Sequence, residues 1–246
     1  MTLYSAETAF RPRQAMLLAA GLGIRMRPIT DRMPKPLIQI GGRSLLERIL
    51  DKLAAAGVSD VVVNAHYLPE QIVGHLAERS APRVRISRES ERLETGGGVV
   101  KALPMLGTEP FFVINGDVLW RDGAVPTLEA LAAAWDAARM DALLLVQSTA
   151  TAIGYDGPGD FDVCDDGRLC RRAERPSAPF LFAGVQILHP RLCADAPAPP
   201  FSLNVLYDRA IAAGRAFAHV HDGGWCHVGT PADIAAAEAF VAAEAR

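Results

Sequence analysis

The sequence predicts an α/β fold, doubly wound, in which helices cover both faces of a mainly parallel sheet. Short apolar runs alternate with helical patterns along most of the chain, and this alternation is typical of strand–helix–strand units. Half of the 246 residues are hydrophobic and 22% are charged, so the chain can bury a sizeable core and is not disordered. Ligands of such folds bind beyond the carboxyl ends of the strands, and we expect a site there.

The elements of the first part follow in the order that such a sheet needs. Strands are predicted at 16–20, 61–64, 84–87, 111–114 and 143–146, and helices at 44–56, 69–78, 99–105 and 128–140. Ser44 and Glu47 have the spacing of a capping box, and Gly57 suits the end of the same helix. Pro69 suits the first turn of the next helix.

The second part is richer in turns and short strands. Strands are predicted at 161–164, 169–171 and 181–188, a hairpin turn at Asp165-Asp166-Gly167, a proline-rich loop at 194–200 and a closing helix at 232–245. Thr230 is predicted as the N-cap of that helix and Pro231 as its start. We expect one domain, 1–246, whose halves, about 14–150 and about 151–246, meet at a cleft.

Composition argues against several classes of protein. The net charge of −3 leaves no basic footprint for nucleic acid or an anionic membrane. Residues 1–13 show no signal peptide, and no run of about 18 apolar residues suggests a membrane span. The four cysteines, Cys164, Cys170, Cys193 and Cys226, form no C-x-x-C pair. We predict reduced thiols in a cytoplasmic protein. The sequence leaves the oligomeric state open.

A glycine loop that carries an arginine follows the first strand. Gly21 and Gly23 let backbone N–H groups approach phosphate oxygens closely, and Arg25 adds planar, permanently charged donors. Lys35 lies between two prolines, which fix its backbone. These features predict a triphosphate cradle. Glycines alone also suit a purely structural loop, and Met26 replaces the third glycine of a dinucleotide-binding fingerprint.

Three more motifs fall near the expected site. Asp117, just after the strand at 111–114, suits Mg²⁺ or a turn cap. The stretch 94–98, Glu-Thr-Gly-Gly-Gly, is predicted as a loop. It either lets a base or ribose lie against the backbone or is simply flexible. His227, just before the closing helix, is either a structural histidine or a ligand.

Taken in this order, the motifs resemble the signature of the sugar-1-phosphate nucleotidyltransferase family. Matching stretches lie at 18–28, 34–36, 94–98, 115–117, 174–176, 182–184 and 228–230. The resemblance implies a Rossmann-like nucleotidyltransferase fold with a smaller, β-rich acceptor portion. It also implies a nucleotide-binding first half and a sugar-phosphate-binding second half. The activity implied is nucleotidyl transfer from a nucleoside triphosphate to a sugar 1-phosphate, with release of pyrophosphate.

Within the family, the chain is most similar to one branch. Its short length, the stretch 94–98 and Gly159-Asp160-Phe161 resemble the uridylyltransferases that act on N-acetylmuramic acid α-1-phosphate in cell-wall sugar recycling. That branch implies UTP as the nucleotide. Short mannose-1-phosphate guanylyltransferases are also similar, so the base, which residues 64–67 and 94–98 would read, is left open, as is the sugar.

The resemblance also implies roles for single residues. Those that contact the nucleotide would be Ala19, Ala20, Gly21, Gly23, Arg25, Lys35, Thr95 and Gly96. Those that contact the sugar phosphate would be Asn115, Gly159, Glu174 and Gly184. Arg25, Lys35 and Asp117 would be catalytic, and Asp117 and His227 would hold the metal. Many relatives carry aspartate in place of His227. Imidazole suits Mg²⁺ less well than Mn²⁺ or Co²⁺, so either of these could be preferred.

The implied mechanism is an in-line attack that needs no general base, because the attacking sugar phosphate is already an anion. Mg²⁺, Arg25 and Lys35 would neutralise charge and fix the geometry. Two other classes are weighed against it. A nicotinamide-dependent oxidoreductase would need the missing third glycine, and a non-catalytic nucleotide-sugar binding protein is suggested only by His227.

Overall fold

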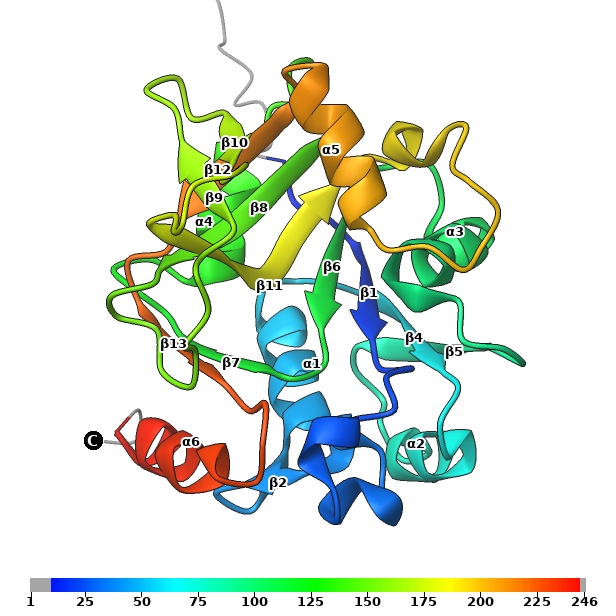
Figure 1. Ribbon diagram of the computed structural model, residues 1–246. Helices are drawn as coiled ribbons and strands as arrows, with labels where there is room; N and C mark the ends of the chain where they lie inside the picture. The colour runs from blue at the N-terminus through cyan, green and yellow to red at the C-terminus, as the bar shows by residue number, and fades with distance from the viewer. Residues whose placement is uncertain (1–9, 244–246) are drawn as a thin grey trace, which may run out of the picture.

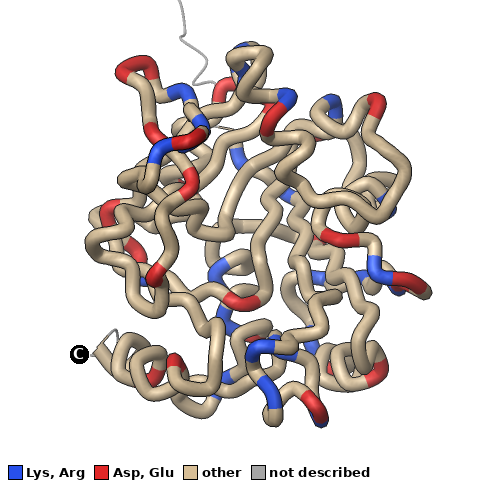
Figure 2. Tube along the Cα trace, viewed as in Figure 1, with Lys and Arg blue, Asp and Glu red and all other residues tan. Residues whose placement is uncertain are grey.

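A computed structural model describes residues 10–243 of the chain (Figure 1). The expectations for residues 1–9 and 244–246, including part of the signal-peptide analysis and the end of the closing helix, lie outside the described residues. No helix in the described range is long and apolar enough to cross a membrane. In Figure 2 acidic and basic residues are interspersed along the trace, so any concentration of charge at a site has to be local.

A nine-stranded sheet forms the centre of the molecule (Figure 1). Its strands are β1 (Gln14–Leu18), β4 (Asp60–Ala65), β5 (Arg83–Arg88), β6 (Phe111–Asn115), β8 (Ala142–Ser148), β9 (Phe161–Val163), β10 (Leu169–Arg171), β11 (Phe180–Leu188) and β12 (Ala216–Val220). The order β10-β9-β11-β6-β1-β4-β5 has β8 and then β12 added beside β11. Strands β6, β1, β4 and β5 are parallel, as are β8 and β12, whereas β11 is antiparallel to both of its long neighbours.

Helices cover both faces of this sheet, as predicted. They are α1 (Leu45–Ala55), α2 (Pro69–Leu76), α3 (Glu94–Leu106), α4 (Thr127–Ala134) and α5 (Asn204–Ala212). Helix α6 (Asp233–Ala242) packs in a separate, smaller core beside the short strands that end at Ile40 and His227. Alternate residues of β1 enter different cores, because successive side chains of a strand point to opposite faces. Leu17 packs in the core that includes α1, α2 and α4, whereas Met16 packs in the core that includes α3 and α5. The predicted doubly wound, mainly parallel fold is confirmed.

The start of α1 forms as predicted. The backbone N–H of Glu47 donates to Ser44 Oγ at 3.1 Å, and the N–H of Ser44 donates to the Glu47 carboxylate at 3.2 Å, which completes the capping box. Gly57, just past the helix, has φ +82°, a conformation that favours glycine. The predicted hairpin also forms, with β9 and β10 antiparallel around Gly167.

The stretch 94–98 is not the predicted loop, because it forms the first turn of α3. Its glycines serve close packing there. A Cβ atom on Gly96 would lie 2.3 Å from the ring of Phe201, and one on Gly97 would lie 2.7 Å from Pro199. One on Gly98 would lie 2.9 Å from the side-chain nitrogen of Asn64. The cost of glycine in a helix is offset by the approach of neighbours that no larger residue would allow.

The two helical glycines Gly96 and Gly74 should respond to alanine in opposite directions. Gly96→Ala overpacks the contact with Phe201 and should lower the free energy of unfolding by about 1–3 kcal/mol. Gly74, exposed in α2, has open space around its Cβ position, so Gly74→Ala should raise it by about 0.5–1 kcal/mol. Denaturant unfolding of both variants measures the difference, and equal effects would contradict the packing argument.

Several predicted helices differ in extent. Helix α3 begins at Glu94 and not at residue 99, and α2 ends at Leu76 and not at residue 78. The helix predicted at 128–140 ends at Ala134, because residues 136–140 are held in another way. The Asp136 carboxylate accepts from the N–H of Ala138 at 2.9 Å, and the Arg191 guanidinium donates to the carbonyl of Met140 at 2.7 Å. Helix α6 begins at Asp233, one residue after the predicted start.

Thr230 is not the N-cap of the last helix. The carboxylate of Asp233 instead accepts from the backbone N–H of Thr230 at 2.7 Å and from that of Gly229 at 3.0 Å. The Thr230 hydroxyl also donates to the Asp233 carboxylate, at 3.0 Å, and does not accept from an N–H of the first helical turn as an N-cap would.

The prediction of four reduced thiols is wrong for one pair. The hairpin turn brings Cys164 and Cys170 to a Cα–Cα distance of 6.8 Å, and they form a disulfide. The two cysteines are six residues apart, a spacing that a search for C-x-x-C does not detect. Cys193 and Cys226 are free and buried, and burial raises the pKa of each thiol to about 11, so both are protonated at neutral pH.

Several elements were not predicted from the sequence. They are α5, β12 and two small antiparallel pairs: β2 (Gln39–Ile40) with β3 (Arg43–Ser44), and β7 (Val118–Arg121) with β13 (Gly224–His227). The second pair matters for the site, because β7 follows Asp117 directly and β13 ends at His227.

Candidate active site

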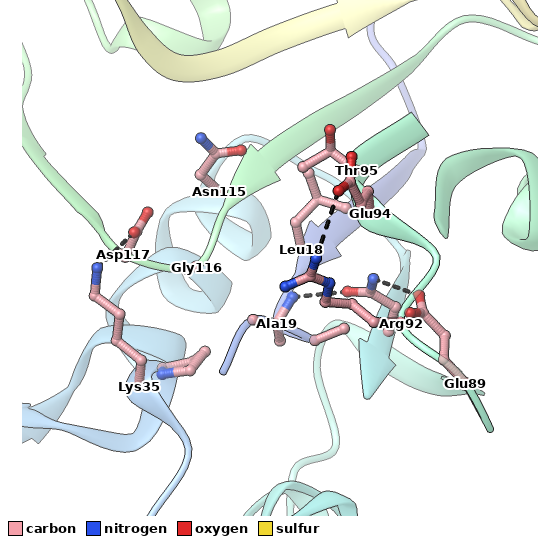
Figure 3. A pocket seen from close by; sticks show the side chains of 14 residues that line it. Leu18, Ala19, Lys35, Glu89, Arg92, Glu94, Thr95, Asn115, Gly116 and Asp117 are labelled. Carbon is pink, nitrogen blue, oxygen red and sulfur yellow. Dashed lines mark hydrogen bonds and ion pairs between the residues drawn. The ribbon is translucent and has the colours of Figure 1, made fainter. Parts of the chain in front are cut away.

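A cavity of about 230 Å³ opens at the carboxyl ends of β1, β4 and β6, where the fold predicts a ligand site (Figure 3). Its lining comes from the loop after β1, the ends of β4 and β6, the segment before α3, and the start of α3. The lining residues are Leu18, Ala19, Ala20, Gly21, Lys35, Pro36, Asn64, Glu89, Arg92, Glu94, Thr95, Asn115, Gly116 and Asp117. Nine of the predicted site residues therefore line one cavity: Ala19, Ala20, Gly21, Lys35, Thr95, Asn115, Asp117 and, in the base-reading stretches, Asn64 and Glu94.

Lys35 and Asp117 form an ion pair at one side of this cavity (Figure 3). The lysine Nζ lies 2.7 Å from Asp117 Oδ2, although 82 residues separate the two in sequence. Pro34 has an extended backbone and leads into the short 3₁₀ turn Lys35–Leu37, so Lys35 is held as the prolines predict. Lys35 is only 8% exposed. An ammonium that is this well fixed is preorganised for charge that develops nearby.

His227 approaches the same carboxylate from the other side. In the β7–β13 pair His227 lies opposite Val118, and its Nε2 is 3.5 Å from Asp117 Oδ2. Burial alone would raise the pKa of Asp117, but the contact with His227 and the charge of Lys35 outweigh burial and hold that pKa well below its ordinary value. Asp117 is therefore ionised at neutral pH. Within residues 10–243, both contacts use Oδ2 and no hydrogen bond or ion pair uses Oδ1.

The parallel pairing of β6 with β1, and the close approach of Gly116 to the end of β1, explain how Asp117 reaches the cavity. The backbone N–H of Gly116 donates to the carbonyl of Leu18 at 2.9 Å, and a Cβ atom on Gly116 would lie 2.7 Å from that oxygen. Only glycine allows this approach. Gly184, with φ +79°, packs behind the same turn, where a Cβ atom would lie 2.9 Å from Val118 and 3.2 Å from the Asn115 side chain. Gly184 thus supports Asn115 and does not itself line the cavity.

A buried relay of hydrogen bonds holds the loop after β1. Asn64 Oδ1 accepts from the backbone N–H of Ala19 at 2.7 Å, and Asn64 Nδ2 donates to Glu89 Oε1 at 2.7 Å. Asn64 is 3% exposed and Glu89 is 5% exposed. Sequence reasoning missed Glu89 and Arg92. Glu89 directly follows the predicted strand that became β5, so a polar residue at a strand's carboxyl end was the signal that could have found it.

Other predicted site residues lie off the cavity lining. Gly23 shapes the loop, with φ +63° and a carbonyl that accepts from the Thr30 hydroxyl at 2.8 Å. Arg25 is exposed on that loop and, among the described residues, makes no hydrogen bond or ion pair. Gly96 donates its N–H to the carbonyl of Phe201 at 2.9 Å, so its backbone is already engaged elsewhere.

On the acceptor side, Gly159 and Glu174 also lie outside the lining. Gly159 has φ +77°, and a Cβ atom there would meet the carbonyl of Ala178 at 2.2 Å, which makes glycine a packing requirement at this position. Glu174 is exposed in the loop that follows β10. The cavity described here therefore collects the predicted nucleotide residues better than the predicted sugar-phosphate residues.

The donor set fits a divalent cation that the substrate helps to hold. In the described part of the chain, no group of three or more histidine, cysteine, aspartate and glutamate side chains forms a self-sufficient metal cage. Asp117 and His227 lie together, and Asp117 Oδ1 is free of protein partners there. Mg²⁺ is commonly held by one or two carboxylates together with substrate phosphates and waters, so one carboxylate oxygen beside a nucleotide cavity suits such an ion.

The fold and the charged cavity define a nucleotide-handling α/β enzyme, and comparison with known proteins identifies its family. A family model described as nucleotidyl transferase matches residues 14–244, and the chain belongs to this family of nucleotidyltransferases. The chain is 43% identical over 236 residues to the N-acetylmuramate alpha-1-phosphate uridylyltransferase of Caulobacter vibrioides. The aligned residues make up 94% of this chain and 98% of the relative.

Two more distant likenesses complete the comparison. A mannose-1-phosphate guanyltransferase of Aspergillus fumigatus is 30% identical over 235 residues, which are 90% of this chain and 62% of the relative. The crystal structure of HddC from Yersinia pseudotuberculosis, complexed with GMP-PN, has the same fold, with a TM-score of 0.76 at 23% identity over 93% of this chain and 99% of that one. The predicted family is confirmed.

Proposed function

We propose that the protein transfers a uridylyl group from UTP to N-acetylmuramic acid α-1-phosphate, releasing pyrophosphate and a nucleotide-sugar for cell-wall sugar recycling. The observation that carries the chemistry is the convergence of Lys35 and His227 on Asp117 beside the cavity at the carboxyl ends of the strands. The choice of substrates is supported by the relative that is 43% identical over almost the whole chain. Use of a nucleoside triphosphate supports a cytoplasmic location.

The reaction brings two anions together, and positively charged side chains of the protein reduce the repulsion between them. An oxygen of the sugar phosphate attacks the α-phosphorus in line, and the bond from this phosphorus to the pyrophosphate oxygen breaks. The attacking oxygen is already an anion, so no side chain has to remove a proton. Lys35, fixed by Asp117, neutralises charge on the α-phosphate, and Arg25 approaches the phosphates from the glycine loop. A bound divalent cation would add Lewis-acid neutralisation of the phosphates.

Different residues of the cavity would contact the nucleotide and the sugar phosphate. Ala20 and Gly21 offer backbone N–H groups to the nucleotide. Ala19, whose N–H donates to Asn64, and Thr95 border the nucleotide as well. On the acceptor side, Asn115 at the end of β6 would meet the sugar phosphate. Gly159 and Glu174 would join it only if their loops lie closer in the complex.

Asp117 and His227 would hold the divalent cation. The family generally depends on divalent metal ions, and Mg²⁺ is the ion proposed here. An imidazole beside a single carboxylate also suits Mn²⁺ or Co²⁺, which accept nitrogen ligands more readily. The metal preference is therefore part of the test.

Pyrophosphate release by the purified protein tests the proposal. UTP, GTP, CTP, ATP and dTTP are crossed with muramic, glucosamine, glucose and mannose 1-phosphates in the presence of Mg²⁺, and the grid is repeated with Mn²⁺ and Co²⁺. Release with UTP and N-acetylmuramic acid α-1-phosphate supports the proposal. Release only with GTP and mannose 1-phosphate would replace it with guanylyl transfer. Binding of a nucleotide-sugar, with no pyrophosphate released by any pair of substrates, would favour a non-catalytic binding protein.

A further inference from the structure

Glu94, the first residue of α3, has an unusual backbone conformation. Its φ is +60°, in the left-handed region where a residue with a Cβ atom is strained. Four non-glycine residues of the described chain have positive φ: Leu68, Glu94, Ala173 and Asp195. Only Glu94 among these four lines the nucleotide cavity. The strain is therefore located at the site.

Contacts on both sides of Glu94 fix this conformation. The carbonyl of Leu93 accepts from the N–H of Phe201 at 3.2 Å, and the carbonyl of Phe201 accepts from the N–H of Gly96 at 2.9 Å. The Thr95 hydroxyl accepts from the N–H of Leu203 at 2.9 Å. The surrounding structure thus imposes the left-handed conformation, which glycine would adopt at lower cost. Because glycine suits the backbone better, the glutamate side chain needs a reason beyond folding.

The protein contacts of the side chain do not supply that reason. The Glu94 carboxylate lies 3.6 Å from the guanidinium of Arg92, and the two side chains are 42% and 55% exposed. A half-exposed ion pair at this distance contributes little to stability. Figure 3 shows both side chains on the opposite side of the cavity from Lys35 and Asp117. Glu94 nevertheless lines the cavity, where a bound ligand could reach its carboxylate.

The chemistry of that side of the cavity indicates what Glu94 meets. Lys35 and the divalent cation that Asp117 would hold mark the end that suits phosphates. The Glu94 carboxylate and the Arg92 guanidinium balance each other's charge, so their side suits the uncharged nucleoside. An ionised carboxylate only accepts hydrogen bonds. Uridine offers two kinds of donor, the ribose hydroxyls and the imino N–H of the base.

We propose that Glu94 is a specificity-determining residue whose carboxylate accepts a hydrogen bond from the nucleoside of the triphosphate. The donor is either the ribose 2′-hydroxyl or the imino N–H of uracil. The identity of the nucleotide rests on the proposed function, and the strained backbone is retained because glycine would remove this acceptor. The role belongs to the side chain, so it can be separated from the backbone by substitution.

Nucleotide binding without an acceptor sugar tests the inference. Dissociation constants for UTP, 2′-deoxy-UTP and N3-methyl-UTP are measured by calorimetry on the wild type, Glu94→Ala and Glu94→Gly. The wild type should bind one analogue at least about 10-fold more weakly than UTP, the scale of a lost hydrogen bond to a charged group. In both variants the ratio of the dissociation constant for that analogue to the dissociation constant for UTP should fall close to one. The analogue that carries the penalty identifies the donor.

Thermal unfolding adds a readout for the strain. Glu94→Gly should raise Tm by about 2–4 °C, because glycine relieves the left-handed conformation, whereas Glu94→Ala retains the strain. Asp195→Gly is the matched control, since Asp195 has φ +55°, is exposed and does not line the cavity. It should raise Tm to a similar extent and leave the ratios of dissociation constants unchanged.

The outcomes separate this inference from the proposed function. Analogue penalties that persist in folded Glu94→Ala, wild type that binds all three nucleotides equally, or wild type that does not bind UTP would each overturn it. Loss of the penalty in both Glu94 variants supports it, whether or not the wild type releases pyrophosphate. Failure of pyrophosphate release with UTP would instead count against the proposed function alone.

Discussion

Asp117→Asn should lower the rate of pyrophosphate release by about 10³-fold or more. A metal ion contributes several kcal/mol to such a reaction, and each 1.4 kcal/mol is about a factor of ten in rate. The amide keeps an oxygen for the Lys35 ammonium, which lies 2.7 Å away, so folding should change little, but it removes the negative charge that would hold the cation. Steady-state rates across a Mg²⁺ titration measure the loss, and Mn²⁺ binding followed by electron paramagnetic resonance measures the site directly.

A charge-matched control makes the Asp117 result specific. Asp51→Asn removes a carboxylate that pairs with Arg79 at 2.9 Å, and Asp51 does not line the nucleotide cavity. That variant should retain nearly the wild-type rate and Mn²⁺ affinity. If Asp117→Asn keeps its activity at low Mg²⁺ while it melts like the wild type, Asp117 is not a metal ligand. Asp117→Ala should lose activity equally but melt earlier, because it also leaves the buried Lys35 without its partner.

Local sequence signals predicted the elements whose stability is local. The capping box of Ser44 and Glu47, the positive φ of Gly57 and the β9–β10 hairpin each depend on residues a few positions apart. The apolar runs likewise predicted the strands that are buried on both faces. The predictions failed for elements that depend on contacts with residues distant in the sequence. The glycines after Thr95 were predicted as a loop, because no nearby residue indicates that Phe201 packs against Gly96 and Pro199 against Gly97.

The candidate site was predictable in its residue types and less so in its geometry. The prolines around Lys35 and the strand before Asp117 predicted two rigid positions. Only the fold, in which β6 pairs with β1 and Gly116 packs against Leu18, brings the two side chains to 2.7 Å from each other. The β7–β13 pair, which brings His227 to Asp117, consists of two four-residue strands with no clear alternation. Glu89 was missed because its role is to accept from Asn64, a residue of a neighbouring strand. Long-range pairing of this kind is not encoded in any short window of sequence.

Lys35→Ala separates the two tasks of the ion pair. Lys35 is not needed to hold the metal, so Mn²⁺ affinity should stay close to that of the wild type, whereas turnover should fall by roughly 10²-fold or more, the scale of losing one preorganised donor to a transition state. The fall should appear in kcat more than in KM, because the charge that Lys35 neutralises grows as the bond to pyrophosphate breaks. Initial rates over UTP and acceptor concentrations measure both constants.

The matched control for Lys35 is Lys52→Ala, since Lys52 also pairs with an aspartate, Asp122, at 3.0 Å, but outside the nucleotide cavity. It should leave kcat nearly unchanged. Near-normal turnover of Lys35→Ala would remove this lysine from the mechanism, and an equal loss of Mn²⁺ binding would mean that it positions Asp117 and does not act on the phosphate. If the Asp117 variant loses metal binding and the Lys35 variant keeps it, the short ion pair joins two separate sources of phosphate neutralisation, one through a cation and one direct.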